Sequence, residues 1–177
     1  MSKGSTIRGT ILPEKEIVDF HGEELVKATL LLDGCKFPIL GGKNALLRPE
    51  GKCNIECIPI QEQLKKGRRS TYLYAVRADV CEESNLEDKN RLKLEGVIDK
   101  IYPTYYVGSM GVPCTRVKLY YQSRGKGLTF IDICATGAYA EKCARVKPGD
   151  KITAKVYIDY KHDELIFNVV SFRFTTK

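Results

Sequence analysis

Three tyrosines lie close together in the stretch "IYPTYYVGSMG" of the second half of the chain. Tyr102, Tyr105 and Tyr106 are accompanied there by Gly108 and Gly111, a composition typical of a loop or hairpin. Flat aromatic rings can stack on unpaired nucleic-acid bases, and each stacked base contributes about 1–3 kcal/mol. The rings can also pack against another part of the chain, but we expect stacking to be their role.

Basic side chains follow these tyrosines at spacings that suit a phosphate backbone. Arg116, Lys118 and Tyr120 alternate along "TRVKLYY", so an extended strand would bring them to one face. Arg124 and Lys126 lie in the glycine-rich stretch "SRGKG". Cations along a backbone and aromatic faces under the bases are the two elements that bind single strands. The pattern therefore predicts a surface for single-stranded nucleic acid.

The phase of "TRVKLYY" decides which of its two tyrosines joins that surface. One of Tyr120 and Tyr121 must be buried, and a β-bulge would exchange them. Val117 and Leu119 set the apolar phase, so we expect Tyr120 to face outward and Tyr121 to be core.

Three further candidates lie later in the second half. Phe130 alternates with Ile131 and Ile133, which suits either a stacking platform or packing on a following helix. Tyr160 and Lys161 lie in "DYKHDE", which we predict to be the turn between the last two strands, within reach of a bound strand.

In the first half the best nucleic-acid feature is "KKGRR", expected to be the turn between two strands. Its four basic residues are Lys65, Lys66, Arg68 and Arg69. A basic hairpin tip can wrap a phosphate backbone, or it can be a solvated turn. Tyr72 and Tyr74 follow on one face, where they could stack on bases or seal an interface with the second half.

Charge divides the chain into unlike halves. Residues 1–88 hold 13 Lys/Arg and 14 Asp/Glu, a net charge of −1, whereas residues 89–177 hold 16 and 8, a net charge of +8. A basic half indicates a polyanionic partner, although a basic soluble surface gives the same count.

The same order of segments occurs twice. The matched pairs are 6–12 with 93–99, 26–32 with 115–121, 36–40 with 129–135, 48–60 with 146–158, and 70–80 with 164–174. The first pair aligns Gly9 with Gly96, and the polar stretch "CEESNLEDKNR" lies between the copies. We therefore predict two domains, residues 1–88 and residues 89–177.

Each copy reads as five alternating strands separated by Gly, Pro and Asp turns. In the second copy the stretch 137–146 can form a helix between the third and fourth strands, whereas "GGKNALLRPEG" in the first copy allows one helical turn at most. Five strands with a helix in that position is the order of an OB-fold. The chain is thus expected to be all-β, with two tandem OB-folds, the first eroded.

The stretch "FIDICATGAYAEKCARVKPGDKITAKVYI" resembles the bacterial single-stranded-DNA-binding protein family, including its phage- and plasmid-encoded relatives. The shared features are an aromatic-led third strand, a small-residue turn, an Ala140-Glu141 helix and a tight turn at 147–150. The resemblance covers most of residues 92–177 and only weakly residues 6–82. It implies an OB-fold that binds single-stranded DNA and assembles into oligomers.

Two departures from that family change the expectation. Family members usually carry one domain, so two copies suggest an internally paired molecule or a dimer with four OB units. They also usually end in an acidic-tipped tail that recruits partners, whereas this sequence ends "FRFTTK". We therefore expect DNA binding without recruitment through such a tail.

Other chemistry finds little support. Neither "GGKNA" nor "SRGKG" is a P-loop, and neither histidine has a triad-like setting. Seven cysteines without C-x-x-C spacing are expected to be reduced core thiols, and zinc at Cys53 and Cys57 is disfavoured. No secretory or membrane segment is apparent. We expect neither a cofactor nor catalysis.

The expected function is non-specific single-stranded DNA binding in the cytoplasm, in replication, recombination or mobile-element transfer. One alternative is an OB-fold interaction subunit of a replication or primosome assembly, and another is an RNA-binding protein. Replication or recombination proteins are possible partners.

Overall fold

The computed structural model describes residues 5–63, 65–123 and 127–175. The chain forms two compact units, each treated separately below. The N-terminal unit contains residues up to 91 together with 160–165, and the C-terminal unit contains 92–159 and the residues from 166 onward.

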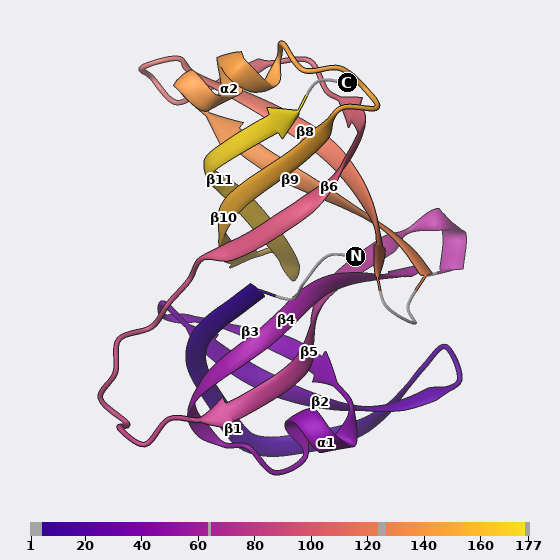
Figure 1. The fold of residues 1–177 in the computed structure, drawn as a ribbon, viewed down its shortest axis with the longest axis vertical. Helices are drawn as coiled ribbons and strands as arrows, with labels where there is room; N and C mark the ends of the chain where they lie inside the picture. The colour runs from indigo at the N-terminus through magenta and orange to yellow at the C-terminus, as the bar shows by residue number, and fades with distance from the viewer. Residues whose placement is uncertain (1–4, 64, 124–126, 176–177) are drawn as a thin grey trace. The chain divides into compact units, whose positions relative to one another are not determined.

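The N-terminal unit is a closed five-stranded barrel (Figure 1). Its elements are β1 (Ser5–Phe20), β2 (Glu23–Leu32), β3 (Cys35–Gly41), α1 (Lys43–Leu46), β4 (Gly51–Gln63), η1 (Lys65–Gly67) and β5 (Arg69–Val80). The strand order is β1-β2-β3-β5-β4, and β3 pairs in parallel with β5. As predicted, α1 is a single turn. β1 runs through "PEKEIVDF" to the His21-Gly22 turn and is longer than the segment expected from the repeat.

The C-terminal unit has the same plan with one added strand. Its elements are β6 (Leu92–Ile101), β7 (Tyr105–Val107), β8 (Val112–Ser123), β9 (Gly127–Thr136), α2 (Ala138–Cys143), β10 (Lys151–Lys161) and β11 (Glu164–Thr175). The order is β6-β10-β11-β9-β8-β7, and an additional β6–β8 pairing closes the ring. The parallel β9–β11 pair corresponds to β3–β5 of the first unit. The prediction of tandem OB-folds, with a helix between strands three and four of the second, is confirmed.

A glycine early in the first strand of each unit allows the barrel to close. A Cβ built on Gly96 would lie 2.9 Å from the carbonyl oxygen of Tyr120, and one on Gly9 would lie 2.8 Å from that of Leu31. Such distances are shorter than side chains tolerate, so only glycine lets these strands curl so closely over their neighbours. This is the role predicted for both glycines.

Alternation of apolar residues builds the barrel cores. In β8 the side chains of Val117, Leu119 and Tyr121 are buried, as predicted from their phase. In β10 the buried side chains are Ile152, Ala154, Val156 and Ile158. Burial of one face leaves the other face of each strand for function.

The N-terminal unit contains a second apolar cluster that involves Tyr72 and Tyr74. Its buried members are Phe20, Leu25, Leu40, Ile58 and Ile60, and Val18, Tyr72 and Tyr74 pack against it. The rings of Phe20 and Tyr72 meet edge to face at 6.3 Å. Both tyrosines are therefore packed within their own unit and half-buried there.

The polar segment before β6 is attached to the N-terminal barrel. The backbones of Arg8 and Lys89 form a pair of hydrogen bonds of 3.0 and 2.9 Å. Lys52 forms an ion pair with Asp88, which also accepts a hydrogen bond from the amide of Asp33. No helix within the described ranges is long and apolar enough to span a membrane.

Candidate nucleic-acid interface

The outer faces of β8 and β9 form one continuous surface. The β8 side chains that point away from the core are those of Arg116, Lys118 and Tyr120, and their cross-strand partners on β9 are Cys134, Asp132 and Phe130. Directly opposed residues of antiparallel strands have side chains in contact range on the same face. Strands two and three of an OB-fold are the strands whose outer face binds oligonucleotides in this fold.

Tyr102 lies at the centre of a cationic group beside this face. It follows the end of β6, and its backbone amide donates a 2.9 Å hydrogen bond to the carbonyl of Arg116. The centroid of its ring lies 4.3 Å from Cζ of Arg116, 4.9 Å from Nζ of Lys100 and 5.8 Å from Nζ of Lys118. A cation within about 6 Å of a ring is attracted by its negative face. Three positive charges thus lie within 6 Å of the centroid of one ring.

Tyr120 and Phe130 form an aromatic pair farther along the same face. They are direct cross-strand partners, their ring centroids are 6.0 Å apart, and the planes are tilted by 42°. Both side chains are half-buried. The predicted outward orientation of Tyr120 is confirmed, since Tyr121 is buried. Phe130 lies beside Tyr120 on the outer face. This is the position expected for a stacking platform, the first of the two alternatives that the sequence left open.

Asp132, which the sequence analysis did not single out, is the acidic residue on this surface. Its Oδ2 lies 3.7 Å from Nε of Arg116, while its Oδ1 is buried and receives no hydrogen bond from the described residues. Burial raises the pKa of the Asp132 carboxyl, and the charges of Arg116 and Lys118 oppose the rise. Its position between Phe130 and Cys134 in an alternating strand was the signal that could have identified it.

Tyr105 and Tyr106 lie in the short strand β7, in one arm of the hairpin that the sequence suggested and not in its loop. β7 pairs with β8, with Tyr105 opposite Cys114 and Tyr106 opposite Pro113. Consecutive residues of a strand point to opposite sides. The Tyr105 side chain is hydrogen-bonded to Cys114, which raises the pKa of the Tyr105 phenol, while the charge of Arg116 opposes the rise.

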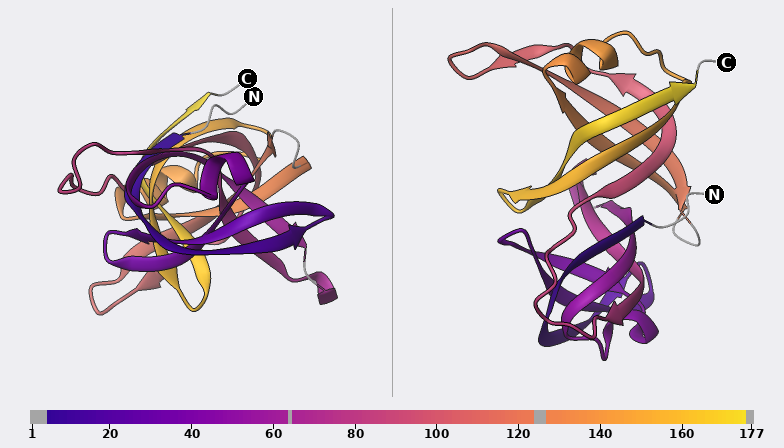
Figure 2. Two further views of the ribbon diagram at one scale, coloured as in Figure 1. Left: turned by 90° about the horizontal axis from the view of Figure 1, so that it is seen from below. Right: turned by 60° about the vertical axis from the view of Figure 1, so that its left-hand side comes forward.

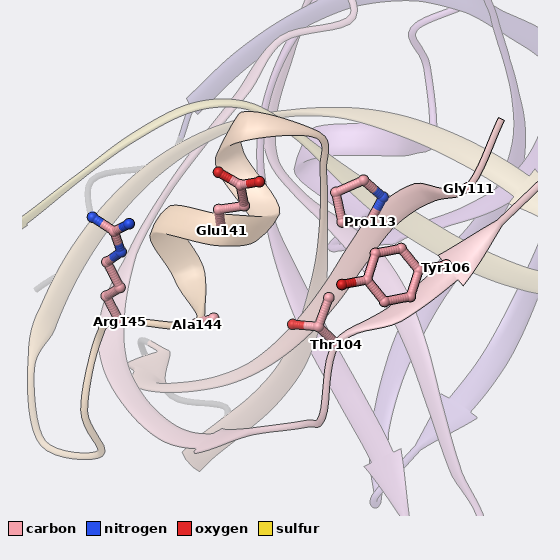
Figure 3. A pocket seen from close by; sticks show the side chains of 7 residues that line it. All are labelled: Thr104, Tyr106, Gly111, Pro113, Glu141, Ala144 and Arg145. Carbon is pink, nitrogen blue, oxygen red and sulfur yellow. The ribbon is translucent and has the colours of Figure 1, made fainter.

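On the other side of β7, Tyr106 lines a pocket that separates the β7–β8 hairpin from α2 (Figure 3). Its volume is about 680 Å³. The lining residues are Thr104, Tyr106, Gly111, Pro113, Glu141, Ala144 and Arg145. Hairpin and helix lie at the same end of this unit in Figure 1 and in the right-hand view of Figure 2. A buried hydrogen bond of 3.1 Å from Oγ1 of Thr115 to the carbonyl of Ala140 ties α2 to β8.

Four of the remaining predicted residues lie outside the described ranges or in the N-terminal unit. Arg124 and Lys126 lie outside the described residues. Tyr160 and Lys161 belong to the N-terminal unit, where the ring of Tyr160 lies 5.8 Å from that of Phe37. Tyr160 is half-buried and Lys161 is exposed.

The "KKGRR" stretch connects β4 to β5, as expected for a hairpin tip. Lys66 adopts a left-handed backbone conformation with φ of 67°. The side chains of Lys66, Arg68 and Arg69 are exposed, and that of Lys65 lies outside the described residues. The stretch belongs to the N-terminal unit and not to the unit that carries the β8–β9 face.

All seven cysteines lie in the described part of the chain, and none of them is in a disulfide. Within the described part of the chain, no three or more His, Cys, Asp or Glu side chains gather in a way that could hold a metal ion.

Two comparisons by sequence found no relative. No protein-family model matches the chain, and no curated protein matches it.

Comparison with solved structures does find a common architecture. The wild-type single-stranded DNA binding protein from Thermus aquaticus superposes with a TM-score of 0.76 at 14% identity, over 99% of this chain and 95% of that one. A deletion mutant of the same protein gives a TM-score of 0.75 at 15% identity, over 100% and 97% of the two chains. Over its whole length, the chain therefore has the tandem, SSB-like OB-fold found in the Thermus aquaticus protein.

Proposed function

We propose that this chain is a non-enzymatic protein that binds single-stranded DNA on the outer face of β8 and β9. The observation that carries the proposal is the group of three cations around Tyr102, beside the Tyr120–Phe130 aromatic pair. The two structures with the same fold are of a protein named for single-stranded DNA binding, which supports the same role here.

The face combines the two interactions that a single strand requires. Lys100, Arg116 and Lys118 would neutralise phosphates, and the release of counterions would make the affinity fall with salt. Tyr120 and Phe130 would stack on bases, which is tolerant of sequence because every base has a π-face. Tyr105 extends the aromatic surface along the edge strand. Non-specific binding with a strong salt dependence follows from this composition.

The division of charge supports unequal roles for the two predicted domains. Residues 89–177, with a net charge of +8, supply the main surface, and residues 1–88, with a net charge of −1, contribute chiefly the exposed basic tip of the β4–β5 hairpin. In the acidic β1–β2 hairpin, the aromatic Phe20 is buried in its own cluster and so offers no stacking surface.

Titration of fluorescent dT oligomers of increasing length, at low and high salt, tests the proposal. Tight, salt-weakened binding of single strands in preference to duplex is expected, and RNA of the same length reports any preference for deoxyribose. The double variant Tyr105→Ala with Tyr106→Ala should bind markedly more weakly. Absence of binding at low salt would overturn the proposal.

A second candidate function is docking of another protein on the β7–β8 hairpin. The hairpin exposes apolar side chains, including Met110 at its tip, which is 89% exposed, and Tyr106 in β7, which is 72% exposed. Exposed apolar patches mark interaction sites. If this function dominates, substitution of Met110 by Ser should abolish partner capture and leave oligo-dT binding unchanged.

In the cell, such a protein would protect single strands during replication, recombination or transfer of a mobile element. Two chains would supply four OB units, and sedimentation with and without DNA would show whether a dimer forms.

A further inference from the structure

The pocket between the β7–β8 hairpin and α2 is separate from the β8–β9 face. Tyr106 and Pro113 line it from the hairpin, while Glu141, Ala144 and Arg145 line it from the helical side (Figure 3). The pocket is open to solvent and has a volume of about 680 Å³. It can therefore accept a group as large as a nucleobase.

The lining offers a flat apolar surface and two opposite charges. Tyr106 is 72% exposed and Pro113 is its cross-strand partner, so the ring is available for stacking. Glu141 can only accept hydrogen bonds when ionised, and Arg145 can only donate them. Neither residue is in an ion pair among the described residues, in contrast to Arg116, which is paired with Asp132. Both charged groups are thus available to a ligand.

The pocket and the proposed DNA path lie on the two sides of one β-strand, β7. Tyr105 points toward the cationic face, with its side chain hydrogen-bonded to Cys114, and the next residue, Tyr106, points into the pocket. β7 is the edge strand of its sheet. A bound strand that reaches Tyr105 can therefore turn one base over this edge.

We propose that the pocket binds one base of the single strand and favours guanine. Guanine can stack on Tyr106 and donate its adjacent N1–H and N2–H groups to the Glu141 carboxylate. Thymine offers a single N–H and cannot satisfy Glu141 in the same way. This inference rests on the proposed function and adds one selective position to otherwise non-specific binding.

The test compares an oligomer of dT with the same oligomer carrying one central dG, dA or dC. The wild-type protein is expected to bind the dG oligomer about tenfold more tightly than pure dT. In Glu141→Gln the ratio of the two dissociation constants should fall toward one. Loss of a negative charge by itself strengthens binding of both oligomers equally, so the ratio separates recognition from general electrostatics.

Lys142→Gln is the matched control, since Lys142 is exposed on the same helix but does not line the pocket. It should leave the ratio unchanged. Equal wild-type affinity for dG and dT oligomers would overturn the guanine site while the proposed function stands. A dG preference that survives Glu141→Gln would also overturn it. Failure to bind any oligomer would remove both proposals.

Discussion

Nε of Arg116 lies 3.7 Å from Oδ2 of Asp132, on the face that we propose binds DNA. The same guanidinium lies 4.3 Å from the centroid of the Tyr102 ring. Arg116 thus lies next to an internal carboxylate, which competes with a DNA phosphate for its guanidinium. In the proposed interface Asp132 would therefore lower the affinity for a polyanion.

Asp132→Asn should strengthen binding of single-stranded DNA by a few-fold. The released Arg116 can take a full phosphate contact, so the slope of log affinity against log salt should become steeper by about 0.7. Titrations with oligo-dT at several salt concentrations measure both the affinity and its dependence on salt. Asp163→Asn, the same charge change in the β10–β11 turn, should leave the slope unchanged; equal effects of the two variants would contradict the assignment.

The same residue gives a dependence of stability on pH. Burial raises the pKa of Asp132 above the ordinary value of 3.8. Between the unfolded and folded pKa values the folded state binds more protons, so the free energy of unfolding falls as pH rises through that window. This contribution is fully present below the unfolded pKa and lost above the folded one. The urea midpoint should fall less between acidic and neutral pH in Asp132→Asn than in the wild-type protein. Equal changes of the midpoint with pH in the two proteins would contradict this.

Tyr120→Ala and Phe130→Ala should each weaken binding roughly tenfold, because each removes a stacking surface worth about 1–3 kcal/mol per base. Thermal denaturation of one sample first shows that each variant folds. Titration of a second, native sample with oligo-dT then measures its affinity. Tyr157→Ala, which truncates an exposed tyrosine of β10, is the control and should bind as the wild type does. Unchanged affinity in both test variants would place the strand elsewhere.

Gly96→Ala should destabilise the protein by about 1–3 kcal/mol, the usual cost of overpacking. The added methyl group would lie 2.9 Å from the carbonyl oxygen of Tyr120, so β6 and β8 must separate. Gly42→Ala is the matched control, since the nearest atom to its added Cβ is at 3.8 Å. Urea denaturation compares the two, and equal losses would show that crowding at β6 is not the cause.

Three buried thiols should resist alkylation in the native protein. Burial raises the pKa of Cys57 to about 12 and those of Cys53 and Cys143 to about 11. The thiolate is the reactive form, so at pH 8 these groups should react with iodoacetamide far more slowly than the half-buried Cys35 and Cys81. Mass spectrometry of native and denatured samples locates the labels. Rapid native labelling at Cys57 would contradict its burial.

Much of the fold was predictable because the relevant signals are local. Alternation identified the buried and exposed sides of β8, so the outward orientation of Tyr120 followed from Val117 and Leu119. The internal repeat identified two units, and Gly9 and Gly96 indicated where each first strand must bend. Strand periodicity, and a glycine that recurs at the same place in both copies, can be read from the sequence alone.

The sequence by itself therefore determined the tandem OB-folds and most of the aromatic and basic candidates. Only the tertiary structure decided how they combine, because strand register brings together residues that are distant in sequence. It set Asp132 against Arg116, placed Phe130 beside Tyr120, and sent Tyr105 and Tyr106 to opposite sides of β7. It also joined α2 and a hairpin into one pocket. These relationships depend on cross-strand pairing and barrel closure, which no local pattern encodes.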